Sequence, residues 1–149
     1  MNYRFFLLSL TVLLVVSGCS DKLPLSGTVT FSDDGAPLTQ GAVFFQSDTL
    51  QAQGGIKPDG TYVVGTDKLT DGIPKGSYRV MLVGTEQIEF KSKTVKDPGG
   101  NNIEMKRETR TPVIDTKYGN VQTSGLTFEV DGKKRKFDFQ VDRAPGSKK

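Results

Sequence analysis

The 149-residue chain contains no histidine, no tryptophan and a single cysteine. Without histidine, the sequence cannot form a Ser-His-Asp triad, a Cys-His dyad or an imidazole-based metal site. One cysteine excludes an intrachain disulfide and a metal site built from several thiolates. These absences remove the commonest enzyme chemistries and leave catalysis by carboxylate, lysine or tyrosine side chains.

Apolar residues and net charge are also scarce. Hydrophobic residues make up 35% of the chain, and 20 Lys+Arg against 17 Asp+Glu give a formal net charge of +3. So small a net charge does not indicate a nucleic-acid partner. The length suits one domain, and the 17 glycines and 7 prolines predict frequent turns.

The longest apolar run lies near the N-terminus. A head with one positive charge precedes the run FFLLSLTVLLVV, which begins at Phe5 and is followed by the small residues Ser17 and Gly18. This pattern predicts a cleaved signal peptide over residues 1–18. A twelve-residue helix of about 18 Å is too short for a bilayer core of about 30 Å, so a permanent transmembrane helix is not expected.

The cysteine follows this run directly, and Val16-Ser17-Gly18-Cys19 resembles the lipobox of bacterial lipoproteins. The resemblance implies cleavage before Cys19, a diacylglyceryl group on its thiol and a lipidated tether over residues 19–23. Since burial of each CH₂ group contributes ~0.8 kcal/mol, two or three acyl chains anchor a protein durably. Ser20, in place of an aspartate, favours the outer membrane over the inner one. The alternative is an ordinary signal peptide with an incidental cysteine.

The rest of the chain alternates apolar and polar residues with a period of two, which is typical of strands with one buried face. Leu25, Val29 and Phe31, for example, share one face of the first such segment. Seven short strands separated by turns predict an all-β sandwich over residues 24–142. A hairpin turn at Asp131-Gly132 is expected to join the last two strands. The seven segments are 25–31, 41–46, 54–56, 61–66, 77–84, 124–130 and 137–141.

Two segments do not follow this pattern. Residues 93–122 lack clean alternation, and a long, partly ordered excursion is expected there, at one end or edge of the sandwich. Within it, residues 103–107 could add an edge strand, and residues 112–114 could dock on the sandwich. The tail over residues 143–149 is expected to be frayed.

Several turn-and-strand motifs occur in a specific order. They are Leu25–Phe31, Gly35–Leu38, Gly41–Phe45, Asp59–Tyr62, Gly72–Val80, Lys117–Gly119, Thr123–Val130 and Phe137–Phe139. Together they resemble carboxypeptidase-regulatory-like and transthyretin-like domains, and small lipoproteins of planctomycete-type bacteria. The resemblance covers most of residues 24–142. It implies a single seven-strand Ig-like (prealbumin-like) sandwich with a non-catalytic binding or scaffolding role.

The same resemblance argues against catalysis. The catalytic branch of the transthyretin family, the hydroxyisourate hydrolases, uses histidines and a C-terminal Tyr-Arg-Gly-Ser motif. This chain has no histidine and ends in Ala-Pro-Gly-Ser-Lys-Lys. We therefore expect no catalytic residues, no cofactor and no metal site.

Charged residues supply the remaining site candidates. The densest run is Lys133-Lys134-Arg135-Lys136, which is either a solvated turn that discourages edge pairing or a contact for anionic headgroups, lipopolysaccharide or wall polymer. Carboxylates could in principle bind calcium or form a hydrolytic pair, but most lie beside glycine or proline, as turn residues do. They are Asp33, Asp34, Asp59, Asp67 and Asp71 for calcium, and Glu86 with Glu89 or Asp138 with Asp142 for a pair.

The sequence thus predicts a lipid-anchored cell-envelope protein that is not an enzyme and that binds or scaffolds a partner. That partner is an envelope protein or a polysaccharide, the membrane is contacted through the lipid anchor, and nucleic acid is not expected. Two alternatives remain. One is an accessory subunit of an envelope transport or secretion complex, and the other is a carboxylate-based hydrolase.

Overall fold

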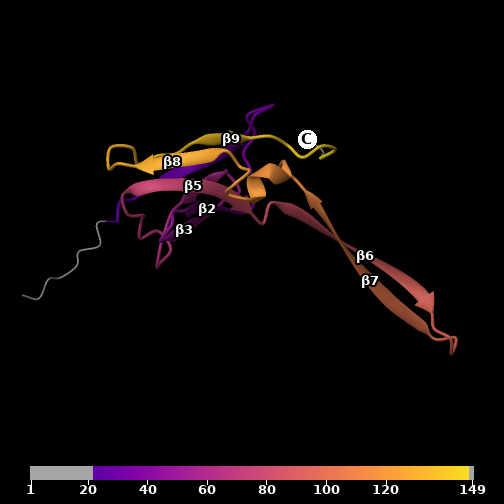
Figure 1. Cartoon of the computed structure of the whole chain (residues 1–149). Helices are drawn as coiled ribbons and strands as arrows, with labels where there is room; N and C mark the ends of the chain where they lie inside the picture. Colours follow the sequence, from indigo (N-terminus) through magenta and orange to yellow (C-terminus); the bar gives the residue numbers. More distant parts are fainter. Residues whose placement is uncertain (1–21, 148–149) are drawn as a thin grey trace, which may run out of the picture.

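The computed structural model describes residues 22–147, which are almost entirely β-structure with the sheets in a sandwich-like arrangement (Figure 1). One sheet has the strand order β4–β1–β9, the second β3–β2–β5–β8, and β6 and β7 form a separate pair. The prediction of an all-β, sandwich-like protein is confirmed. The elements are β1 (Ser26–Phe31), β2 (Ala42–Gln46), β3 (Gln51–Gly55), β4 (Thr61–Val63), β5 (Gly76–Val83), β6 (Glu86–Lys96), β7 (Asn102–Pro112), the 3-10 helix η1 (Thr116–Gly119), β8 (Leu126–Val130) and β9 (Phe139–Val141).

The period-two pattern places one face of each sandwich strand in the core. In β1, Val29 and Phe31 are buried between half-buried threonines, and in β5 the same holds for Val80 between more exposed neighbours. Full burial of an aliphatic or aromatic side chain contributes about 1.5–3 kcal/mol. A chain with few apolar residues can therefore build this core only by turning nearly all of its strand apolar residues inward.

An aromatic cluster joins the two sheets. The ring of Phe45 on β2 lies 6.3 Å from that of Tyr62 on β4, 6.4 Å from Tyr78 and 6.2 Å from Phe137, measured between centroids. The Tyr62 hydroxyl donates to the Phe137 carbonyl oxygen at 2.6 Å. This contact satisfies the one polar group of a side chain that is otherwise completely buried.

The turn predicted at Asp131-Gly132 does not close a hairpin. β8 pairs antiparallel with β5, whereas β9 pairs parallel with β1 in the other sheet. The chain therefore crosses between the sheets at this point, which brings the rings of Phe128 and Phe137 together at a centroid distance of 4.5 Å. The hairpin prediction was wrong. An alternating pattern indicates which face of a strand is apolar, but it does not indicate which sheet the strand joins.

The excursion predicted over residues 93–122 is largely regular structure. β6 and β7 form a long antiparallel hairpin that begins before residue 93 and projects from one end of the sandwich (Figure 1). The pattern was missed because nearly every hairpin residue is exposed, so that no buried face imposes alternation. The edge strand considered at 103–107 is part of β7, which pairs with β6. Ile114, just beyond the hairpin, is buried in the core, as expected for the docking segment.

The C-terminal tail is also more ordered than expected. The Arg143 guanidinium lies 3.6 Å from the centroid of the Phe31 ring and pairs with both Asp33 and Asp34. Ala144 is buried and donates its N–H to the Val113 carbonyl at 3.0 Å. These contacts hold the described part of the tail, up to residue 147, against the end of the sandwich from which the hairpin projects.

Candidate functional site

The β6–β7 hairpin is the most exposed regular element of the described chain. Eleven residue pairs join β6 to β7, from Glu86 opposite Pro112 at the base to Lys96 opposite Asn102 near the tip. The turn is closed by Asp97, whose carboxylate accepts the Asn101 N–H at 2.8 Å. Because these strands form a two-stranded sheet, their outer edges carry backbone N–H and C=O groups without a strand partner in the described structure.

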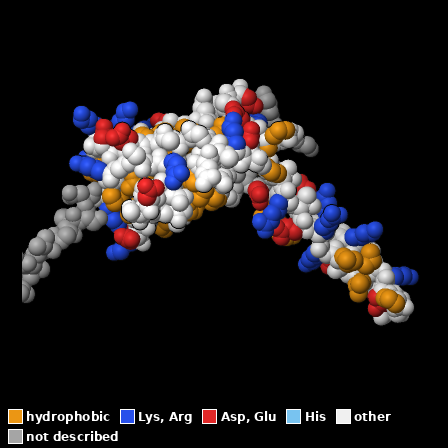
Figure 2. All heavy atoms as spheres, in the orientation of Figure 1, with side chains coloured by type: hydrophobic (Ala, Val, Ile, Leu, Met, Phe, Trp, Pro, Cys, Tyr) orange, Lys and Arg blue, Asp and Glu red, His pale blue; other side chains and the backbone are white. Residues whose placement is uncertain are grey.

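Large apolar side chains lie exposed on this hairpin. Phe90 is 69% exposed, Met105 58%, Ile88 49% and Ile103 44%. Figure 2 shows hydrophobic side chains gathered toward the outer end of the hairpin, where no part of the sandwich covers them. The strand register places Ile88 and Phe90 on one face of the ribbon and Ile103 and Met105 on the other. The hairpin thus exposes large apolar side chains on both of its faces, which is the composition of a contact surface.

Charged side chains are distributed unevenly along the hairpin. At its base, Arg110 lies 3.8 Å from Glu86 and also pairs with Glu108. In the middle, Lys91 stands opposite Arg107, with further lysines on either side. Lysines on an edge strand oppose indiscriminate strand pairing. A partner for this surface therefore has to match its charges as well as its apolar side chains.

The predicted basic run lies at the other end of the sandwich, in the connection between β8 and β9. All four side chains of Lys133–Lys136 are exposed. The Asp131 carboxylate accepts the backbone N–H groups of Lys133 and Lys134 and fixes the turn, and these hydrogen bonds lower the pKa of Asp131. Lys136 pairs with Asp138 at 2.9 Å. The structure therefore leaves three of the four cations without a carboxylate within 4.0 Å in the described chain.

The predicted lipid site, Cys19, lies outside the described residues, as do the proposed signal peptide and most of the tether. The first described residue, Lys22, pairs with Asp67 and Asp71, and Leu23 forms a two-hydrogen-bond bridge with Ile73. Between residues 22 and 147, no helix is long and apolar enough to cross a membrane.

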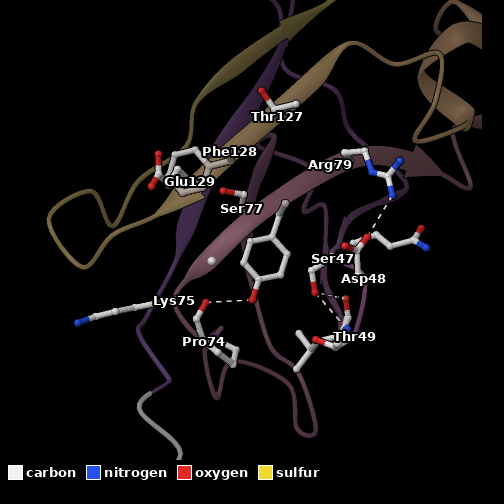
Figure 3. Close-up of a pocket in the computed structure, with 14 residues that line it drawn as sticks. Ser47, Asp48, Thr49, Pro74, Lys75, Ser77, Arg79, Thr127, Phe128 and Glu129 are labelled. Carbon is white, nitrogen blue, oxygen red and sulfur yellow. Dashed lines mark hydrogen bonds and ion pairs between the residues drawn. The ribbon is translucent and has the colours of Figure 1, made fainter.

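An open hollow of about 900 Å³ lies beside the loop after β2 and the first residues of β5 (Figure 3). Three of its polar side chains have partners within the protein: Tyr78 donates its hydroxyl to the Pro74 carbonyl at 3.0 Å, and Arg79 lies 3.8 Å from Asp48. The two carboxylates that line the hollow, Asp48 in the loop after β2 and Glu129 on β8, lie on opposite sides of it (Figure 3). The hollow therefore does not present the paired carboxylates of a glycoside-hydrolase site.

The carboxylates considered as a hydrolytic pair have other partners. Glu86 and Glu89 are three residues apart on one strand, so they face opposite sides of the ribbon. The ion pair with Lys136 and the N–H of Thr28 lower the pKa of Asp138. Such carboxyl groups stay ionised at neutral pH and are poorly suited to act as a general acid.

The carboxylates considered for calcium accept hydrogen bonds from backbone N–H groups in turns or form ion pairs. Asp34 accepts the N–H of Ala36 at 3.0 Å, and Asp59 that of Thr61 at 3.0 Å. Asp71 accepts the Thr66 N–H at 2.6 Å in addition to its ion pair with Lys22. Within residues 22–147, no group of three or more metal-ligating side chains comes together.

Asp142 organises a polar cluster near the base of the hairpin. Its carboxylate accepts from the Lys117 ammonium at 2.6 Å, the Ser32 hydroxyl at 2.7 Å and the Tyr118 hydroxyl at 3.1 Å. These donors, Lys117 first, lower the pKa of Asp142 to about 2. The cluster thereby ties η1 to the junction of β1 and β9.

This cluster predicts a stability change in acid. Because the folded-state pKa of Asp142 lies below the value of about 3.9 expected in the unfolded chain, its contribution is present above about pH 4 and is lost as the pH falls toward 2. We expect the difference in urea midpoint between wild type and Asp142→Asn, measured at pH 7, to shrink at pH 3. Glu104→Gln, an exposed carboxylate on the hairpin, is the control. A difference that is unchanged between the two pH values would contradict the assignment.

The hairpin is the candidate site that the sequence analysis missed. A signal for it exists: apolar residues two apart, at 88 and 90 and again at 103 and 105, flank the turn sequence Asp97-Pro98-Gly99-Gly100-Asn101. The basic run, in contrast, was found from sequence. Only the structure separates the two, at opposite ends of the sandwich (Figures 1 and 2).

The fold and these sites define an all-β protein with sandwich-like sheets and one projecting two-stranded hairpin. No known protein family matches the chain, and no curated protein matches it. Among solved structures, it is similar to a 9R-lipoxygenase from Cyanothece PCC8801, with 13% sequence identity and a TM-score of 0.34. The match covers 89% of this chain and 18% of that chain, so it carries no argument about function.

Proposed function

We propose that this protein is a lipid-anchored, non-catalytic binding protein of the bacterial cell envelope, and that the β6–β7 hairpin is its binding surface. The observation that carries the proposal is the hairpin itself, which projects from the sandwich with Phe90 and Met105 exposed. Its partner is a protein that lays an extended segment along one open edge of the hairpin. In that arrangement, main-chain hydrogen bonds supply affinity, and alternate side chains supply specificity.

The anchor is Cys19, which becomes the first residue of the mature chain when the signal peptide is cleaved. What supports it is the lipobox-like sequence before the cysteine and the absence of any other thiol in the chain. Ser20 favours the outer membrane as its location, with the domain on its periplasmic or surface side. The first described residues enter the sandwich at the end away from the hairpin (Figure 1). An anchor there leaves the hairpin free to reach a partner.

The domain itself is proposed to be an Ig-like, prealbumin-like sandwich of the carboxypeptidase-regulatory and transthyretin type. The three-stranded and four-stranded sheets, seven strands together, support this assignment. So do the buried tyrosines that follow the turns in the resembling motifs, Tyr62 and Tyr78. Domains of this kind serve many functions on one fold, so the role is argued from the hairpin and not from the architecture.

The hairpin is tested by photo-crosslinking in the native cell. With a photoreactive residue in place of Phe90 or Met105, we expect a discrete protein adduct that mass spectrometry can identify. The complex is then rebuilt from purified proteins, and the double variant Phe90→Ser/Met105→Ser is expected to raise its Kd at least tenfold, because exposed apolar anchors carry much of such binding energy. The melting temperature should change little, since both side chains are exposed in the free protein.

Leu69 supplies the matched control. It is 81% exposed and lies in a loop at the opposite end of the sandwich, so Leu69→Ser removes exposed apolar surface away from the hairpin. Unchanged affinity of the double hairpin variant, or equal loss in Leu69→Ser, would refute the hairpin as the binding surface. If the adduct is a component of a transport or secretion complex, the protein is the accessory subunit considered above.

A further inference from the structure

The end of the sandwich at which the described chain begins carries a group of unpaired cations. A Cβ atom placed on Gly132 would lie 3.5 Å from Cδ1 of Leu23 and 3.4 Å from Cε of Lys75. The turn that bears Lys133 and Lys134 thus lies against both Leu23, near the start of the described chain, and Lys75 in another loop. Three segments distant in sequence meet at this one end.

The cations at this end are free to contact a ligand. Lys75, Lys133, Lys134 and Arg135 are exposed, and none has a carboxylate oxygen within 4.0 Å in the described chain. Lys22 pairs with both Asp67 and Asp71, so it compensates one of their two charges, and the Asp131 carboxylate faces backbone N–H groups. Figure 2 shows Lys and Arg side chains at this end of the sandwich with carboxylates between them.

An exposed leucine lies at the same end. Leu69 is 81% exposed, the largest exposure among the large hydrophobic side chains described. Its loop is held by the Asp71 contacts with Lys22 and with the Thr66 N–H, and by the bridge between Leu23 and Ile73. A leucine held out on a fixed loop beside lysines has the arrangement of an interfacial membrane contact.

We infer that this end of the sandwich is a membrane-binding face for anionic phospholipid headgroups. The inference rests on the proposed anchor at Cys19. Four residues of extended chain span at most about 14 Å, so Leu23 and the basic turn beside it are held within about two Debye lengths of the bilayer surface. Each basic side chain near an anionic surface favours the bound state by about fivefold. Two contacts, the lipid and this face, then fix the sandwich upright and direct the hairpin away from the membrane.

The test reconstitutes the lipidated full chain into vesicles and measures the distance of two positions from the headgroups. Cys19 is consumed by the lipid, so a cysteine introduced at Ser77, near the basic end, or at Asn102, near the hairpin tip, is the single free thiol. Each is labelled with a fluorophore, and the vesicles carry a nitroxide quencher in the headgroup region. One set contains 30% phosphatidylglycerol in phosphatidylcholine, and the other contains phosphatidylcholine alone.

We expect quenching of the Ser77→Cys label to be at least twofold greater in the anionic vesicles, and 0.5 M NaCl to abolish that difference. The triple variant Lys133→Glu/Lys134→Glu/Arg135→Glu should lose the difference as well. The matched variant Lys91→Glu/Lys93→Glu/Arg107→Glu has the same net charge but alters the hairpin. This variant should retain the difference in quenching between the two vesicle types. Leu69→Ser should reduce quenching in both vesicle types, and the Asn102→Cys label should stay unquenched.

Three results would overturn the inference. The first is equal quenching of the Ser77→Cys label in both vesicle types. The second is an equal effect of the two triple variants on this quenching. The third is quenching that increases only after lipopolysaccharide or wall polymer is added. Failure of the anchor gives a separate signature, because a protein without lipid does not float with vesicles of phosphatidylcholine alone.

Discussion

Replacing Cys19 by alanine is expected to abolish incorporation of a clickable fatty acid into the protein. The physical reason is that a thioether to diacylglycerol requires a thiol, and the chain contains no other cysteine. Ser20→Ala, one residue further on, should leave labelling intact. Gel fluorescence of the purified protein after metabolic labelling measures both. Persistent labelling of the Cys19→Ala chain would exclude Cys19 as the acylation site.

A second variant separates the lipid from the apolar leader. If residues 1–19 are replaced by a signal peptide that is cut by the general signal peptidase, the mature chain begins at Ser20 and carries no acyl chain. We expect this protein to move almost completely from the detergent-extracted membrane fraction to the soluble envelope fraction, since two or three acyl chains contribute ~0.8 kcal/mol per CH₂ of anchoring. Membrane retention unchanged at high salt would contradict the anchor.

Gly27→Ala is expected to destabilise the fold by about 3 kcal/mol or more. A Cβ atom at this position of β1 would lie 1.9 Å from the Phe137 carbonyl oxygen and 2.6 Å from the Tyr62 hydroxyl oxygen. These two atoms are hydrogen-bonded to each other across the point where the chain crosses between the sheets. The substitution therefore displaces the crossing segment and breaks the contact that satisfies a fully buried hydroxyl.

Thermal and urea unfolding measure this effect, with an expected drop in melting temperature of about 10 °C or more. Gly55→Ala is the matched control, because Gly55 also lies in a strand of the sandwich and a Cβ there has no neighbour within 4 Å. Its stability should change by less than about 0.5 kcal/mol. Equal melting temperatures for the two variants would show that the chain does not cross so close to β1.

The local sequence pattern predicted the sandwich strands because a strand with one buried face alternates apolar and polar residues. Val29 and Val80 are buried where alternation placed them, and Tyr62 and Tyr78 also lie in the core. The same logic failed for the hairpin, since Phe90 and Met105 are apolar but exposed. A strand without a buried face is under no constraint to alternate apolar and polar residues, so the sequence specifies it only weakly.

The candidate surfaces also differ in how much of each could be recognised from the sequence. Lys133–Lys136 could be recognised from sequence as a dense charge run, but its proximity to Lys75 and Leu23 depends on three separate segments meeting in space. Leu69 carried no signal, because a single leucine in a polar loop is ordinary until its exposure is known. The hairpin was recognised only once it was known that the strand carrying Ile88 and Phe90 pairs with the strand carrying Ile103 and Met105.

The sequence by itself determined the exclusion of histidine- and disulfide-based chemistry, the position of the single acylatable thiol and the all-β class, because these depend on residue identity and local period. Only the tertiary structure decided that β8 and β9 lie in different sheets, that residues 86–112 form a projecting hairpin, and that this hairpin and the basic run Lys133–Lys136 lie at opposite ends of the sandwich. Those features depend on which strands pair over long separations. Strand pairing is set by the packing of the whole core, as the Phe45, Tyr62 and Phe137 contacts show.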